Sequence, residues 1–186
     1  ETKTLHIPGF LRSIALNHYL PGVTVHVPED RLELQELNVT HLAMPNVLPN
    51  HLTKLEISGL TRNVGPLQTC FQYLSRDLLE LTILTERPPL QFSTLAGLPN
   101  GLQKLNIHAI FDDGPEFFAS LPSGLRYLQL TDAGGSLELS ARNISALPSQ
   151  NLRTLKLPKA HGLTKNKEVS LLPRTLTSLK LAPGGQ

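Results

Sequence analysis

The chain has 186 residues, with 17 basic and 15 acidic side chains, a net charge of +2 and 40% hydrophobic residues. This length and composition suit one folded domain with a substantial core, and no apolar run approaches the length of a membrane-spanning helix. The single cysteine, Cys70, excludes an internal disulfide and favours a reducing, cytoplasmic compartment.

Two Asn-x-Ser/Thr triplets, at Asn38 and Asn143, are acceptor patterns for N-glycosylation in secreted proteins. They keep secretion open as an alternative location. Because such triplets arise readily by chance, we expect a cytoplasmic protein.

Near the N-terminus, alternating apolar residues predict short strands around Leu5, at residues 23–27 and at residues 37–39. The step from Val25 to Leu37 is 12 residues. That step is too short for a whole turn of the repeat found further along the chain. One of these two strands must therefore be irregular, and the sequence leaves open which one.

From Leu48 onwards one pattern recurs, Leu-Pro-x-x-Leu-x-x-Leu-x-(Leu/Ile). Four copies are complete and two are looser, because one has Ser75 instead of proline and another holds an extra residue before Leu152. The first core leucines stand at positions 52, 78, 102, 125, 152 and 176, so the steps are 26, 24, 23, 27 and 24 residues. A period in the twenties is typical of a solenoid, in which each unit stacks on its neighbour.

The last two apolar residues of each copy stand two apart, which places both on one face of a short strand. Stacking the copies predicts one buried row of leucines, and no single copy can bury its own leucine alone. The row comprises Leu55, Leu81, Leu105, Leu128, Leu155 and Leu179.

Between the strands, prolines such as Pro88, Pro89 and Pro115 argue against long helices. Short helical or 3₁₀ turns are expected at residues 67–74 and 115–121. We therefore predict an α/β-type repeat solenoid. Its curved parallel β-sheet lies on the concave side, and its convex segments are short, irregular and 3₁₀ or helical.

The repeat core resembles the leucine-rich repeat superfamily over about residues 34–181. The Leu-Pro opening is similar to FNIP-type repeats of amoebae and fungi, whose Phe-Asn-x-Pro-(Leu/Ile) element is partly echoed by Asn63-Val64-Gly65-Pro66-Leu67. The asparagine that usually follows the strand in this superfamily is absent here. Its places hold Leu60, Glu86, Ile110, Ala133, Ala160 and Gly184.

The chain is expected to be one solenoid over residues 1–186 and a segment of a larger protein. A solenoid's end unit needs a polar outer face or a cap. The last copy is as apolar as the internal ones, and only residues 182–186 follow it.

No pattern predicts catalysis, and we expect no enzyme, no cofactor and no metal site. The seven histidines include no pair at the i, i+4 spacing of a helical metal site. The acidic run at residues 112–116 is shorter than a calcium loop and reads as turn chemistry. No glycine pair is followed by the Lys-Ser/Thr of a phosphate loop.

Charge is unevenly distributed along the chain. Residues 150–186 hold seven basic side chains against Glu168, a net charge of +6, so the remainder of the chain is at −4. An acidic-to-basic gradient along the outward strand positions would select and orient a partner. The alternative is a solvated face that carries charges without binding anything.

The resemblance implies a protein-interaction module that binds a protein or peptide on its exposed strand face. Sparse aromatics argue against stacking recognition of nucleic acid. The alternative is electrostatic binding of a polyanion or an acidic membrane surface through the basic C-terminal repeats. The oligomeric state stays open. The predicted partner-binding residues are Lys104, Asn106, Arg126, Tyr127, Gln129, Arg153 and Lys156.

Overall fold

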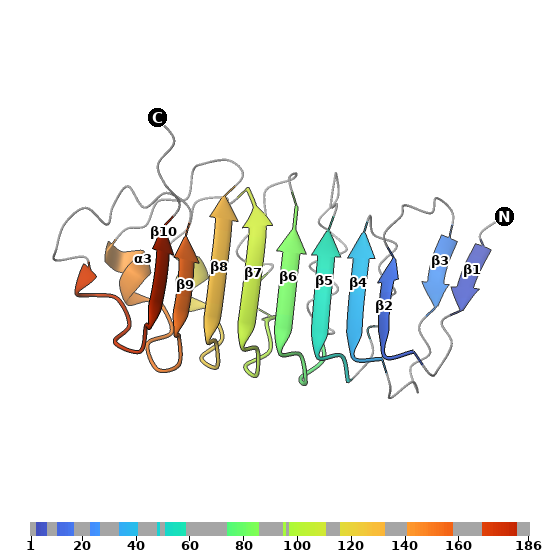
Figure 1. Ribbon diagram of the computed structural model, residues 1–186, viewed down its shortest axis with the longest axis horizontal. Coiled ribbons are helices and arrows are strands. Elements are labelled where there is room, and N and C mark those ends of the chain that lie inside the picture. The colour runs from blue at the N-terminus through green and yellow to red at the C-terminus, as the bar shows by residue number, and fades with distance from the viewer. Residues whose placement is uncertain are drawn as a thin grey trace.

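The computed structural model describes residues 3–6, 11–16, 23–26, 34–40, 48, 51–58, 74–85, 95, 97–110, 116–132, 141–157 and 169–181. Eight strands lie side by side in one parallel sheet (Figure 1). They are β2 (Ser13–Leu16), β4 (Glu36–Thr40), β5 (Lys54–Ser58), β6 (Glu80–Leu84), β7 (Lys104–Ala109), β8 (Tyr127–Asp132), β9 (Thr154–Leu157) and β10 (Ser178–Leu181). From β4 to β10 each passage of the chain adds one strand beside the previous one, so the fold is a parallel-strand solenoid.

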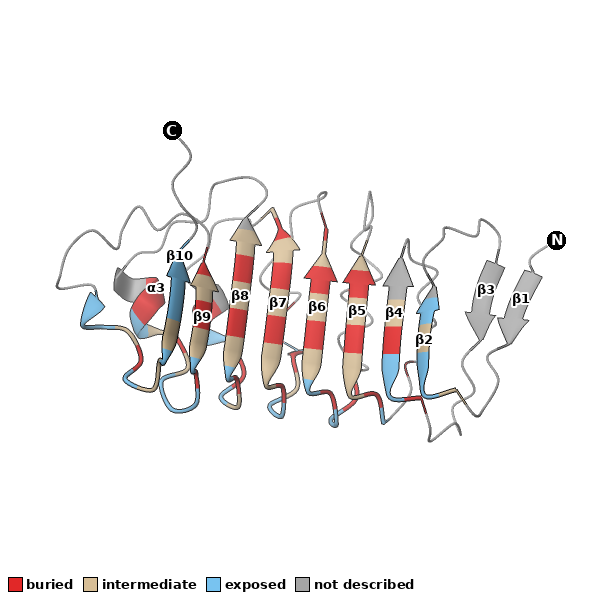
Figure 2. Cartoon of the chain, viewed as in Figure 1, coloured by how far each residue is buried: buried red, intermediate tan, exposed pale blue. Residues whose placement is uncertain are grey.

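The predicted buried row of leucines is confirmed from Leu55 to Leu155, whereas Leu179, its last predicted member, is 39% exposed. Successive cross-strand pairs join Leu37, Leu55, Leu81, Leu105, Leu128, Leu155 and Leu179. The leucines from Leu55 to Leu155 are 0% exposed. Burial alternates along β5 to β9, as Figure 2 shows, because successive strand residues point to opposite faces.

Each strand begins with a local irregularity that turns two consecutive side chains outward. The carbonyl of Gln103 accepts hydrogen bonds from the amides of Arg126, at 2.8 Å, and Tyr127, at 3.0 Å. The same two-to-one arrangement recurs at the carbonyls of Arg12, Gln35, Thr53, Leu79, Arg126 and Arg153. It resembles a β-bulge, in which two residues oppose one. This bonding explains why the first two leucines of a copy stand three apart and are both buried.

The Leu-Pro opening forms a tight turn before β7, β8 and β10. The amides of Leu102, Leu125 and Leu176 donate to the carbonyls of Pro99, Pro122 and Pro173, at 3.0, 3.2 and 3.1 Å. Where Ser75 replaces proline, Leu78 makes the same bond at 3.2 Å, and the Ser75 hydroxyl accepts from the amide of Asp77 at 3.1 Å. The hydroxyl thus supports the turn that the proline ring supports elsewhere.

The extra residue before Leu152 is accommodated in this turn. The side chain of Asn151 donates to the carbonyl of Ser123 at 3.0 Å, which ties the longer turn to its neighbour. Leu128 still pairs with Leu155, so the strand register is unchanged.

Behind the sheet, the core is closed by short helical segments. Helix α2 (Glu116–Ala119) contributes Phe118, and α3 (Ala141–Ser145) contributes Ile144; both side chains are 1% exposed. The expected turn at residues 115–121 is therefore confirmed. Of the second expected turn, at residues 67–74, residues 67–73 lie outside the described residues. The described helices have only four and five residues, so the part of the chain that the structure describes is predominantly β.

Strand β2 was not predicted from the sequence. Strand β3 (Val23–His26) does not pair with β4 but with β1 (Lys3–His6), in a separate parallel sheet whose strands point the other way in Figure 1. The partner of β4 is β2, in which Ile14 pairs with Leu37, 23 positions later. The short step from Val25 to Leu37 therefore connects two different sheets, and the main sheet begins before residue 34.

At the other end, β10 is much less covered than the internal strands. Leu179 and Leu181 are 39% and 42% exposed, whereas their partners Leu155 and Leu157 are 0% and 3% exposed. Within the described residues, β10 pairs on one side only, with β9. The expectation that the chain is a segment of a larger protein stays a prediction.

The turns of adjacent repeats pack closely at two glycines. A Cβ on Gly124 would lie 2.6 Å from the carbonyl oxygen of Asn100, and a Cβ on Gly101 would lie 3.3 Å from that of Arg76. We expect Gly124→Ala to lower the free energy of unfolding by about 1–3 kcal/mol, because one backbone segment must move. Gly101→Ala should cost less than about 1 kcal/mol by the same reasoning. Urea unfolding of both variants measures this; equal costs would contradict it.

Candidate partner-binding face

The strand face is defined here as the outward side of β4 to β10, opposite the core, together with the residue that precedes each of these strands. On the internal strands its side chains are intermediate or exposed, while their neighbours in sequence are buried. Among the described elements, contacts join neighbouring strands and join α2 with α3. No described helix or second sheet covers the strand face.

All seven predicted partner-binding residues lie on this face, on three adjacent strands. Lys104 pairs with Tyr127, and Asn106 pairs with Gln129, which in turn pairs with Lys156. Arg126 and Arg153 precede β8 and β9, and the carbonyl of Arg126 accepts the amide of Arg153 at 2.9 Å. The structure therefore brings the set together; that it binds a partner stays a prediction.

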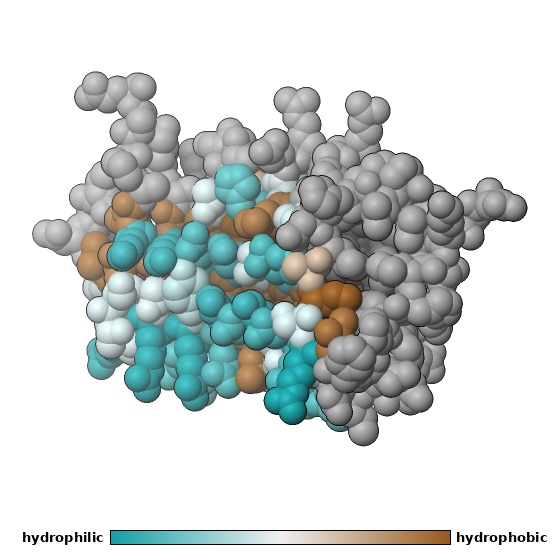
Figure 3. All heavy atoms as spheres, turned by 45° about the vertical axis from the view of Figure 1, so that its right-hand side comes forward, coloured by the Kyte–Doolittle hydropathy of each residue, from teal (hydrophilic) through white to brown (hydrophobic). Residues whose placement is uncertain are grey.

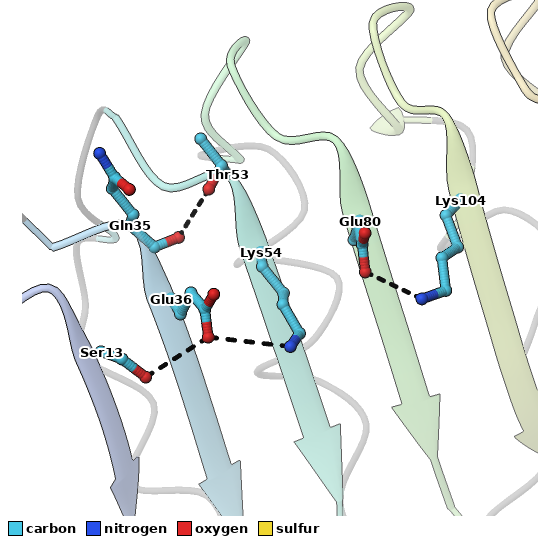
Figure 4. A network of polar contacts seen from close by, with 7 residues as sticks. All are labelled: Ser13, Gln35, Glu36, Thr53, Lys54, Glu80 and Lys104. Atoms are coloured by element: carbon cyan, nitrogen blue, oxygen red, sulfur yellow. Dashed lines mark hydrogen bonds and ion pairs between the residues drawn. The ribbon is translucent and has the colours of Figure 1, made fainter.

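Toward the N-terminal side, opposite charges pair across neighbouring strands (Figure 4). The Nζ of Lys54 lies 3.7 Å from Oε2 of Glu36, which also accepts the hydroxyl of Ser13 at 3.4 Å. The Nζ of Lys104 lies 3.0 Å from Oε2 of Glu80. These side chains are 41% to 50% exposed, and pairs of this kind contribute at most about 1 kcal/mol each.

Tyr127 is the centre of a second cluster. The Nζ atoms of Lys156 and Lys104 lie 5.1 and 5.9 Å from the centroid of its ring. Its hydroxyl donates to Oε1 of Gln129 at 2.5 Å. Two ammonium groups near one ring restrict the ring's orientation, since each is attracted to the negative face of the π-system.

The strand face divides into two parts of opposite charge. The acidic half, on β4 to β6, carries Glu36, Lys54, Glu56 and Glu80, which is three negative and one positive charge, or −2. The basic half, on β7 to β10, carries Lys104, Arg126, Arg153, Lys156 and Lys180, or +5, with no acidic side chain among its described outward positions. The charge gradient expected from the sequence is thus present on one surface.

An exposed leucine and two asparagines with buried amide oxygens distinguish this face from a uniformly charged one. Leu79 precedes β6 and is 40% exposed, at the boundary between the two halves. The Oδ1 atoms of Asn38 and Asn106 are both buried, and neither accepts a hydrogen bond from the described residues. An unsatisfied buried acceptor costs about 1–3 kcal/mol, so these amides are more constrained than surface asparagines.

The glycosylation triplets do not lie in exposed loops. Asn38 is in the middle of β4, and Asn143 is in α3 with 8% exposure. Attachment of a glycan at Asn143 would require its side chain to leave the core. The location of the protein in the cell stays a prediction.

Other candidate chemistry lies away from the strand face. The Nδ1 of His51 lies 3.0 Å from Oδ2 of Asp77, an exposed pair between two neighbouring turns. The described residues include no group of three or more His, Cys, Asp or Glu side chains placed to hold a metal. None of the described helices is long and apolar enough to span a membrane. Cys70 and residues 112–115 lie outside the described residues.

No family model, curated protein or solved structure matches this chain. The candidate binding site therefore rests on the arrangement of these residues in the structure. The seven predicted residues do not include Lys180, which the register places beside Lys156. The repeat pattern could have identified Lys180, because Lys156 and Lys180 occupy the same position of successive copies.

Proposed function

We propose that this protein is an interaction module of the leucine-rich repeat type, close to the irregular FNIP-like subtype, and that it binds a protein partner on its strand face. One observation carries the proposal. Seven polar and charged side chains from three adjacent strands form one surface that no described element covers. Tyrosine and arginine, both present there, are the residue types most often found as energetic anchors of interfaces.

The repeat geometry supports this use of the surface. Because each strand begins with two outward residues, every repeat presents more side chains than a regular strand of the same length. The leucine rows fix the backbone beneath them, so the outward side chains stand on a rigid support. A preorganised surface loses less conformational entropy on binding.

Binding should depend on Arg126 and Tyr127. We expect the double variant Arg126→Ala/Tyr127→Ala to bind the natural partner at least about tenfold more weakly, since both side chains stand at the centre of the surface. The free energy of unfolding should fall by about 1 kcal/mol or less, because neither side chain belongs to the core. Quantitative affinity capture followed by calorimetry with the purified partner measures the loss.

A matched control is Asn100→Ala/Ser123→Ala, which alters two exposed turn residues outside the strand face. The control should retain every partner that the unmodified protein captures. Retention of the same partners by the Arg126→Ala/Tyr127→Ala variant would place the binding surface elsewhere.

The second candidate function is binding of a polyanion, which the charge of +5 on the basic half favours. A salt titration separates the two candidates. Polyanion affinity falls steeply and regularly with salt because counterions are released, whereas a packed protein interface is much less sensitive.

A further inference from the structure

The two halves of the strand face differ in whether their basic side chains form ion pairs with described residues. In the acidic half and at its boundary, Lys54 and Lys104 each have a carboxylate partner on the preceding strand. In the basic half, Arg126, Arg153, Lys156 and Lys180 form no ion pair with any described residue. Among the described residues, the lysines on one side of the face therefore have carboxylate partners and the four cations on the other side have none.

These four cations are also placed beside one another. Lys156 pairs directly with Lys180, and Arg126 and Arg153 occupy equivalent positions on adjacent strands. Neighbouring strands lie about 4.8 Å apart, and like charges in directly opposed positions destabilise a sheet. An arrangement that opposes stability in the free protein is typical of a site where an anionic group of a partner supplies the missing charge.

The acidic half limits what such a partner can be. Glu56 lies on β5, two strands from β7, and forms no ion pair with a described residue, whereas Glu80 on β6 is already paired with Lys104. A long chain of uniform negative charge that extends past β7 meets these carboxylates and is repelled. Leu79, exposed at the boundary, offers an apolar contact between the two charged regions.

We propose, on the basis of the function proposed above, that the partner contributes an extended segment of mixed charge that lies across the strands. Its acidic end lies over β8 to β10, opposite Arg126, Arg153, Lys156 and Lys180. Its basic end lies over β5, opposite Glu56, and an apolar residue between the two ends contacts Leu79 on the neighbouring repeat. From β5 to β10 the segment spans roughly 24 Å, which about seven residues of extended chain cover.

A protein segment fits these features better than a nucleic acid. Nucleic-acid strands carry one charge of the same sign per nucleotide, so the acidic half opposes them. Their binding also uses aromatic platforms for base stacking. The aromatic side chains among the described face positions are Tyr127 and His108, and the Tyr127 ring already lies near two lysine ammonium groups.

Two synthetic peptides of identical composition test the proposal. The blocked peptide has four glutamates, then Gly-Leu-Gly, then three lysines. The interleaved peptide alternates the same glutamates and lysines around the same centre. At a salt concentration of about 50 mM, fluorescence anisotropy should show the blocked peptide binding at least about fivefold more tightly, and this ratio should approach one near 0.5 M salt.

Two charge-reversed proteins provide the controls. Arg153→Glu/Lys180→Glu changes the basic half and should abolish or invert the preference for the blocked peptide. Arg76→Glu/Arg174→Glu makes the same change of net charge at exposed turn residues and should keep it. A thermal scan of each variant confirms that it is folded before binding is measured.

Each other outcome overturns the inference. If the two peptides bind equally, or if neither binds at millimolar concentration, the protein does not distinguish the order of acidic and basic residues in a segment. Tighter binding of an all-glutamate peptide or of a single-stranded oligonucleotide shows that the ligand is a polyanion. The proposed function fails separately, when the Arg126→Ala/Tyr127→Ala variant retains the natural partner.

Discussion

Replacing Leu128 by aspartate is expected to unfold the protein at ordinary temperature. Leu128 is 0% exposed and lies in the leucine row between Leu105 and Leu155. A carboxylate at this position loses its hydration and gains no described donor. The cost of several kcal/mol is comparable with the whole stability of a typical domain, about 5–15 kcal/mol.

Circular dichroism and urea unfolding measure the effect. The matched control is Gln129→Asp, which adds the same group one residue further along, on the outward side and opposite Lys156. It should change the free energy of unfolding by about 1 kcal/mol or less. Similar unfolding midpoints for the two variants would show that Leu128 is not in a continuous core.

Phe118→Ala is expected to lower the free energy of unfolding by about 3–5 kcal/mol. Phe118 is among the largest fully buried side chains and is contributed by α2, a helix of only four residues. A helix this short is not stable alone, so its position depends on what its side chains bury. Truncating Phe118 removes apolar contacts from the core and leaves a cavity behind the sheet.

Two further substitutions isolate the cause. Phe118→Leu keeps much of the volume and should cost less than about 1.5 kcal/mol. Ala119→Ser changes an exposed neighbour and should be near neutral. Denaturant unfolding of the three variants ranks them, and a Phe118→Ala protein as stable as Ala119→Ser would mean that α2 does not close the core.

The leucine rows were predictable because burial imposes a strict spacing on the sequence. A residue that must point into the core of every turn recurs at the same place in each copy, and the steps from Leu52 onwards follow directly. Inserted residues did not obscure this pattern, since the turn before Leu152 takes up its extra residue without shifting the strand pair.

Strand β2 was missed although it carries part of the same signal. Leu11, Ile14 and Leu16 have the spacing of the core, but no Leu-Pro pair precedes them. The neighbouring valines at residues 23–27 give a stronger strand pattern, although their strand, β3, pairs with β1 and not with β4. Only pairing between strands distinguishes the two sheets, and local composition does not encode it.

The helical side of the repeat was predicted only in outline. The amides of Leu98, Leu147 and Leu172 bond to the carbonyls of Leu95, Ile144 and Val169, three residues earlier, at 3.2 Å in each case. These three copies therefore each include an apolar residue three positions before the leucine of the Leu-Pro pair. Because the intervening segments differ in length, this position is difficult to align by eye.

On the strand face, positions were predictable but contacts were not. Register alone places Tyr127 between Lys104 and Thr154, and Gln129 between Asn106 and Lys156, because outward residues recur with the repeat. Which cation pairs with a carboxylate depends on side-chain rotamers and on the neighbouring strand. The sequence therefore does not predict the contrast between Lys104, which pairs with Glu80, and Lys156, which forms no ion pair with a described residue.

Mapping the bound partner onto backbone amides by nuclear magnetic resonance tests most directly whether the strand face is the binding surface. Labelled protein is titrated with the natural partner's binding segment or with the blocked peptide, and each amide shift is followed. The predicted result is that changes concentrate on β7 to β10 and on the residues before them, with the largest at Arg126, Tyr127 and Arg153. Changes confined to the turns near Gly101 and Gly124, or to α2 and α3, would contradict a binding role for the strand face.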